Sequence, residues 1–141
     1  MDLAKHEYFI LHPDPTVGKV LRIILREAGA QAIRIFEDFV GALAAVRNGK
    51  GDVLLVDERL CGPVDWPVAR GLRQVVRERS APVAIMMTSA PTRQILEMAL
   101  SEGYASVIAV PFSVRTFTAH VERAFSGPPR PGDLADKFLV D

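Results

Sequence analysis

The chain has 141 residues, of which 49% are hydrophobic and 24% are charged, a composition typical of a soluble globular protein with one sizeable core. Lysine plus arginine equals aspartate plus glutamate at 17 each, so the chain lacks the basic excess of a non-specific nucleic-acid binder. It has no apolar run near the roughly 20 residues of a membrane span, and its first residues lack the apolar centre of a signal peptide. We therefore expect a cytoplasmic protein with no nucleic-acid or membrane partner.

Short apolar runs alternate along the chain with segments in which apolar residues recur at helical spacing. The runs predict strands at residues 8–11, 32–36, 52–57, 82–89 and 107–109. The periodic segments predict helices over 17–28, 39–46, 68–76, 91–99 and 114–125, with a loop at 60–63. Strands that alternate with helices in this way build a parallel sheet covered on both faces. We predict an α/β fold of the flavodoxin-like, doubly wound (βα)5 type, a three-layer sandwich with a five-stranded parallel sheet.

Several expected helices begin with residues suited to that position. Asp14 followed by Pro15 is typical of an N-cap with proline at the first helical position. Pro91 is expected in the first turn of the fourth helix, and Asp38 and Ser113 can cap two others. The apolar stripe of the first helix consists of Val17, Val20, Leu21, Ile24 and Ala28.

The end of the chain differs in composition from the rest. The segment "SGPPRPGD" at 126–133 breaks the last helix, so residues 1–126 are expected to form the domain and residues 127–141 a tail or linker. The last apolar residues, Leu134 and 138–140, are too few to form a stable helical turn alone. Cys61 is the only cysteine, so the chain forms no internal disulfide, and we interpret this thiol as structural.

Polar side chains follow several of the expected strands. His12, Pro13 and Asp14 come after the first strand, Asp57 and Glu58 follow the third, and Thr88 ends the fourth. Because the carboxyl ends of parallel strands meet at one edge of the sheet, these side chains are expected to share that edge. An acid and a hydroxyl on neighbouring strand ends suit a phosphoryl or oxyanion site, and they equally suit simple strand-end capping.

The layout resembles the receiver domain of bacterial two-component response regulators, of the single-domain chemotaxis type, over residues 7 to about 126. The resemblance is carried by "DPTVGKVLRIILREAGA", "DVLLVDERL", "PVAIMMTSA" and "VPF". The spacing also fits, with 31 positions from Asp57 to Thr88 and 22 from Thr88 to Val110. The resemblance implies that Asp57 is the phosphate acceptor and that the Thr88 hydroxyl contacts the phosphoryl group.

Other positions of the family's site are changed in this chain. The acidic pair that holds Mg²⁺ falls on His12 and Pro13, the lysine falls on Val110, and the switch aromatic falls on Val107. Proline has no side-chain ligand and imidazole suits transition metals better than Mg²⁺, which prefers oxygen. The site therefore resembles a degenerate, pseudo-receiver site with no cofactor, in which Val107 stays packed in one rotamer.

Asp14, Asp57 and Glu58 are weak candidates for a metal site. Asp14 is better explained as the N-cap of the first helix, and Glu58 is either a solvated loop carboxylate or a group leaning over the strand ends. His12 with Asp57 would supply two ligands, which are too few for a transition metal. His6 and His120 are expected outside the site as surface or packing residues.

The sequence leads to two functional hypotheses. The first is an atypical, Mg²⁺-independent receiver domain that acts as a protein-interaction module, with a histidine kinase, a downstream target or a second copy as partner. Its face would be formed by the fourth helix, fifth strand and fifth helix, through Arg93, Glu97, Tyr104, Arg115 and His120. The alternative is a conventional phospho-switch that accepts phosphate on Asp57 and uses Mg²⁺.

We do not expect an enzyme. "HPDPT" at 12–16 superficially resembles the D-x-D-x-T signature of phosphatases, but His12 stands where the nucleophilic aspartate would be needed. No P-loop pattern occurs, and Pro13 and Pro15 remove two backbone donors from a flavodoxin-like phosphate loop.

Overall fold

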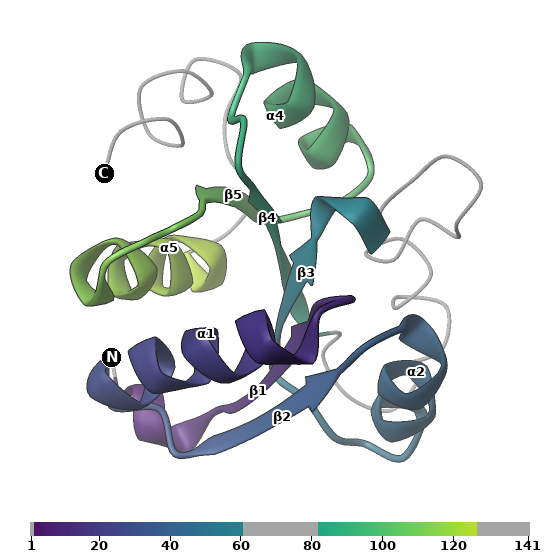
Figure 1. The fold of residues 1–141 in the computed structure, drawn as a ribbon, viewed down its shortest axis with the longest axis vertical. Helices are drawn as coiled ribbons and strands as arrows, with labels where there is room; N and C mark the ends of the chain where they lie inside the picture. Colours follow the sequence, from purple (N-terminus) through teal and green to yellow (C-terminus); the bar gives the residue numbers. More distant parts are fainter. Residues whose placement is uncertain (1, 61–81, 127–141) are drawn as a thin grey trace.

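The computed structural model describes residues 2–60 and 82–126. The strands are β1 (Glu7–Leu11), β2 (Ala32–Phe36), β3 (Val53–Asp57), β4 (Val83–Thr88) and β5 (Ser106–Ala109). The helices are α1 (Pro15–Glu27), α2 (Phe39–Arg47), α4 (Arg93–Ser101) and α5 (Val114–Phe125), with short 3-10 helices η1 (Leu3–Lys5) and η2 (Glu58–Leu60). All strand pairs are parallel, in the order β2-β1-β3-β4-β5 (Figure 1). This order confirms the flavodoxin-like fold that the sequence predicts.

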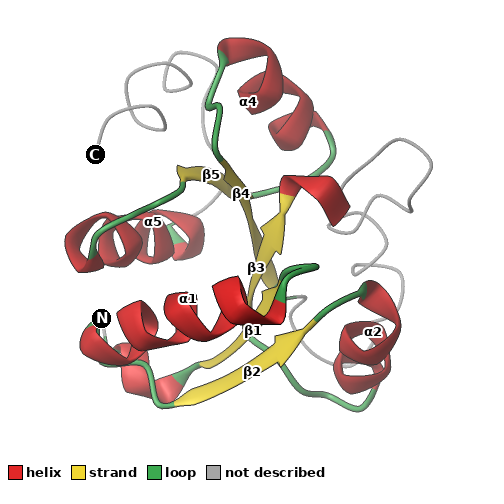
Figure 2. Ribbon diagram, in the orientation of Figure 1, coloured by secondary structure: helices red, strands yellow, loops and turns green. Residues whose placement is uncertain are grey.

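Helices cover both faces of the sheet (Figure 2), and an apolar core lies on each face. On one face α2 and α4 cover side chains such as Phe9, Leu54 and Met86. On the other face α1 and α5 cover side chains such as Ile10, Leu55 and Ile85. Every residue of β3 is buried, as expected for a central parallel strand covered on both sides.

Some details differ from the sequence predictions. Thr92 caps α4 and Pro91 precedes that cap, so proline is not in the first turn of the helix. Leu60 belongs to η2 rather than to a loop. The helix expected at 68–76, Cys61 and the tail at 127–141 lie outside the described residues.

The side of α1 that packs on the sheet also differs from the apolar stripe that the sequence predicts. The residues that face the sheet are Gly18, Leu21 and Leu25, while Val17 and Val20 are 37% and 53% exposed. A Cβ on Gly18 would lie 2.7 Å from Cγ2 of Ile35 on β2. The helix therefore approaches β2 most closely at this glycine, and that approach turns the two valines outward.

A polar clamp fixes β1 against the start of β3. The backbone N–H of Glu7 donates to the Asp52 carboxylate at 2.7 Å, and the N–H of Gly51 donates to the Glu7 carboxylate at 2.7 Å. This clamp agrees with a register in which Leu11 lies opposite Val56. The next residues along the two strands, His12 and Asp57, therefore reach the carboxyl edge of the sheet side by side.

None of the helices among residues 2–60 and 82–126 is long and apolar enough to cross a membrane.

Tyr8 on β1 should make the stability of the fold sensitive to alkaline pH. Its side chain is fully buried and its hydroxyl donates to the Leu3 carbonyl at 2.8 Å. Burial, followed by the charges of Asp52 and Asp2, raises the pKa of Tyr8 to about 12. The unfolded chain ionises this phenol near its ordinary pKa of about 10, so the stabilisation is complete below that pH and is lost between about pH 10 and 12.

We expect the free energy of unfolding to fall by about 2–3 kcal/mol across that interval. Urea unfolding at a series of pH values measures the loss, with Tyr8→Phe as the control. The variant should be less stable at neutral pH because it lacks the hydrogen bond, and its stability should fall less steeply above pH 10. An equal slope in both proteins would contradict the role of Tyr8.

Candidate functional site

The candidate site lies at the carboxyl edge of the sheet, where β1 and β3 end beside each other. His12 follows β1 and its backbone N–H donates to the Phe36 carbonyl at 2.9 Å, which extends the ladder toward β2. Asp57 is the last residue of β3 and Thr88 is the last residue of β4. All three are buried, with exposed fractions of 5%, 6% and 1%. A buried carboxylate needs compensating partners, because desolvation of an unpaired charge is costly.

Arg59 pairs with the Asp57 carboxylate and compensates its charge. The Asp57 Oδ2 atom accepts from the backbone N–H of Arg59 and from its Nε–H, both at 2.9 Å. The short helix η2 turns the chain back immediately after β3, so a residue two positions further on reaches the same carboxylate. The hydrogen bond and the charge of Asp57 together raise the pKa of Arg59 above its ordinary value. The guanidinium therefore stays charged beside the carboxylate.

His12 contacts the other oxygen of the same carboxylate. Its Nε2 atom lies 3.3 Å from Asp57 Oδ1 and 3.0 Å from Nη2 of Arg59. On the far side of the ring, Nδ1 accepts from the backbone N–H of Asp14 at 2.9 Å. A neutral imidazole has one acceptor nitrogen, so it satisfies only one of these two donors at a time. The backbone donor is fixed, whereas the Arg59 side chain is 63% exposed and can adjust.

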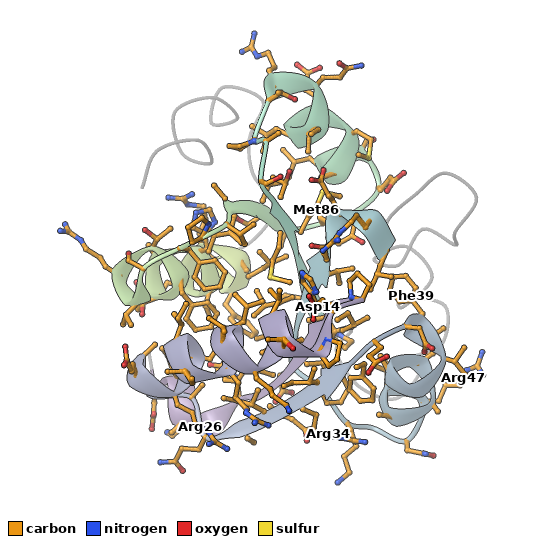
Figure 3. The ribbon with its side chains drawn as sticks, viewed as in Figure 1. Asp14, Arg26, Arg34, Phe39, Arg47 and Met86 are labelled. Carbon is orange, nitrogen blue, oxygen red and sulfur yellow. The ribbon has the colours of Figure 1, made fainter. Side chains whose placement is uncertain are left out.

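Asp14 is engaged as the cap of α1 (Figure 3). Its Oδ1 atom accepts from the backbone N–H of Thr16 at 2.9 Å, and Pro15 occupies the start of the helix. This geometry confirms the N-cap that the Asp-Pro sequence predicts. The hydrogen bond from Asp14 to His12 therefore joins the start of α1 to the Asp57 cluster.

The remaining predicted positions make contacts of their own. The Thr88 hydroxyl oxygen accepts from the backbone N–H of Ala90 at 3.1 Å, at the same edge of the sheet. Val110 is half-buried, and its N–H donates to the Thr88 carbonyl at 2.9 Å. Val107 is packed in the core beneath α2 and α4 and is 1% exposed. Pro13 is exposed and Glu58 is partly exposed in η2.

The residues present do not fit the Mg²⁺ ion that the receiver fold implies. Among residues 2–60 and 82–126, the side chains that pair with Asp57 include an imidazole and a guanidinium, whereas Mg²⁺ prefers oxygen ligands in octahedral geometry. Pro13 offers no ligand, and the Asp14 carboxylate is held by its capping bond. Within residues 2–60 and 82–126, no three His, Cys, Asp or Glu side chains are grouped so that they could hold a metal ion.

Arg59 is the site residue that the sequence interpretation missed. A signal for it was present, because it is a basic residue two positions after a carboxylate that ends a buried strand. Whether such a side chain turns back onto the carboxylate depends on the conformation of the following turn. Here that turn is η2, which the sequence did not reveal.

The expected recognition face is only partly exposed. Arg93, Glu97 and Arg115 lie at the surface, and Arg93 approaches Glu97 at 3.8 Å along α4. Tyr104 and His120 are each 2% exposed, so the prediction that they lie on this surface is wrong. His120 is held inside by a hydrogen bond between its Nδ1 and the Ser106 hydroxyl. His6 stacks against Phe125 with ring centroids 4.6 Å apart, outside the Asp57 cluster.

No protein-family model matches the chain. The chain is 26% identical over 121 residues to the DNA-binding response regulator MtrA of Mycolicibacterium smegmatis, a match that covers 86% of this chain and 51% of that protein. It is 24% identical over 110 residues to the chemotaxis protein CheY of Pseudomonas aeruginosa, covering 78% of this chain and 88% of that protein. The chain therefore spans about half the length of the first of these relatives.

A solved structure shows the same fold. The receiver domain of the sensor histidine kinase PA1611 from Pseudomonas aeruginosa superposes with a TM-score of 0.69 at 22% identity, covering 86% of this chain and 98% of that domain. That structure has a magnesium ion coordinated in its active-site cleft. The chain thus has the CheY-like fold of response-regulator receiver domains, with sequence similarity to them over most of its length.

Proposed function

We propose that this chain is a receiver domain of two-component signal transduction that works as a protein-interaction module without Mg²⁺. The observation that carries the proposal is the pairing of Asp57 with Arg59 and His12. Phosphoryl transfer to a carboxylate is catalysed mainly by cations that position the phosphoryl group and neutralise its charge. In the described part of this chain, the Arg59 guanidinium already occupies one oxygen of the Asp57 carboxylate.

The partner of such a module is a protein, either a histidine kinase or a downstream target. The exposed residues Arg93, Glu97 and Arg115 of α4 and α5 form a mixed-charge surface suited to recognising a protein or a second copy of the chain. The domain acts by binding and carries out no turnover of its own. With Val107 buried in the core instead of a movable aromatic, its surface is held in one conformation.

A conventional phospho-switch is the second candidate function. Asp57 and Thr88 lie on neighbouring strands at the same edge of the sheet, as a phosphate acceptor and its contacting hydroxyl would. The exposed Arg59 side chain would then have to leave the Asp57 oxygen and use its charge on the phosphoryl group. This candidate requires Mg²⁺, for which the present side chains offer a poor ligand set.

Acetyl phosphate separates the two candidates. In millimolar Mg²⁺ the wild-type protein is expected to remain largely unmodified, because His12 and Pro13 replace the acidic Mg²⁺ ligands and Val110 replaces the lysine. Intact-mass measurement soon after mixing records any gain of a phosphoryl group, with Asp57→Asn as the control. A stoichiometric gain that disappears in Asp57→Asn would establish the phospho-switch and refute the module.

A further inference from the structure

Helix α1 has an apolar row on its outer side, away from the sheet. The row consists of Val17, Val20 and Ile23, which are 37%, 53% and 59% exposed. Successive members are three residues apart, so they are neighbours on the helix surface. Half of the large hydrophobic side chains that are exposed within residues 2–60 and 82–126 belong to this one helix. Single exposed apolar residues need no explanation, whereas a contiguous group marks a contact surface.

The charged residues of α1 itself are mostly positive. Lys19, Arg22 and Arg26 lie on the same helix, and Glu27 is its only acidic residue. Figure 3 shows Arg26 toward the opposite end of α1 from Asp14. Two copies of α1 packed against each other would bring these like charges together. The row therefore favours an occupant that is apolar and acidic.

The last nine residues of the given sequence combine apolar and acidic side chains. Residues 133–141, with the sequence "DLADKFLVD", contain four apolar side chains larger than alanine, three aspartates and one lysine. Leu134 and Phe138 are four residues apart, the spacing of neighbours along one side of a helical turn. The segment is too short to be stable alone, so it gains most from a surface that binds it.

The end of α5 lies within reach of the α1 apolar row for a chain of this length. The segment follows α5, which packs beside α1, and Phe125 at the end of α5 stacks on His6 before β1. Six residues, 127–132, separate Ser126 from Asp133 and can span about 20 Å. Helix α1 is about 20 Å long and about 10 Å wide, so a six-residue connection from the end of α5 can reach its outer side.

We propose that residues 133–141 of this chain bind the α1 apolar row, with their aspartates directed to Lys19, Arg22 and Arg26. Bound there, the segment excludes other proteins from the outer side of α1. The short connection to α5 gives it a high effective concentration, so even weak contacts keep it in place. This contact does not depend on the chemistry of Asp57.

Variants of the 141-residue chain test this contact from both sides. Val20→Asp places a carboxylate in the row, and we expect trypsin to cleave after Lys137 at least about tenfold faster than in wild type. The matched control is Val40→Asp on α2, where Val40 is 78% exposed and lies on the opposite face of the sheet. This control is expected to leave the cleavage rate unchanged. Because Val20 and Val40 are both exposed, neither variant removes a core contact.

Phe138→Asp tests the contact from the side of the segment. It is expected to shift the backbone amide resonances of Val20 and Ile23 and to leave those of α2 unchanged. Unaltered α1 amides in Phe138→Asp, or equal cleavage in wild type and Val20→Asp, would overturn the proposal. Amide shifts on α1 that depend on protein concentration would also overturn it, because the occupant would then belong to a second copy.

Discussion

We expect a variant with His12→Asp, Pro13→Asp and Arg59→Gln to bind Mg²⁺ more tightly than the wild-type protein. The two new carboxylates would stand at the end of β1 beside Asp57, where the imidazole now lies 3.3 Å from the carboxylate. Arg59→Gln removes the cation that holds Asp57 Oδ2. Three neighbouring carboxylates repel one another without a cation and supply the oxygen ligands that Mg²⁺ prefers.

The matched control carries the same Arg59→Gln change with His12→Asn and Pro13→Asn, which keep the side-chain size and remove the charge. We expect Mg²⁺ to bind the acidic variant at least about tenfold more tightly than the control, and to raise its melting temperature through that binding. Amide shifts of Asp57 and Glu58 during a Mg²⁺ titration give the affinities. Equal affinities in the two variants would show that the ligand set at 12 and 13 is not what sets metal binding.

Gly51→Ala is expected to destabilise the fold by about 2–5 kcal/mol, a large part of the stability of a small domain. Gly51 has a φ of 85°, which costs an alanine about 1–2 kcal/mol. A Cβ there would also lie 2.8 Å from the ring of Phe9, which is fully buried. The clash would displace either Phe9 or the N–H of Gly51 that clamps β3 to Glu7.

Gly49→Ala separates these two costs. Gly49 has a φ of 81°, and a Cβ there meets nothing within 4 Å. This variant should lose only the conformational term, about 1–2 kcal/mol. Urea unfolding of both variants measures the difference. If the two alanines cost the same, the packing of Phe9 against Gly51 is looser than the 2.8 Å approach indicates.

The fold could be predicted because the strands are encoded by continuous apolar runs. "DVLLVD" and "PVAIMMTS" have the length and composition of buried parallel strands, and β3 and β4 begin within one residue of the expected positions. Helix faces were harder to predict, because apolar periodicity alone does not show which side approaches the sheet. In α1 the smallest residue, Gly18, makes the closest approach and leaves Val17 and Val20 exposed.

The candidate site could be predicted in position but not in its contacts. Strand ends placed His12 and Asp57 at one edge, and the register brings them together. The role of Arg59 depends on the turn made by η2, and the burial of His120 depends on its hydrogen bond to Ser106. Residue spacing in the sequence predicts neither of these two features. Sequence reasoning therefore located the carboxylate and missed the cation that compensates it.

The central claim is that Arg59 and His12, instead of a metal ion, compensate the charge of Asp57. The most direct test is a titration of the wild-type protein with Mg²⁺. The amide resonances of Asp57, Glu58 and Arg59 report the binding. The pairing predicts small shifts that grow linearly through millimolar Mg²⁺ without saturating, because a competing cation must displace the guanidinium from Asp57 Oδ2. Saturable binding at sub-millimolar Mg²⁺ would contradict the account, since it would require an oxygen ligand set at the end of β1 and β3.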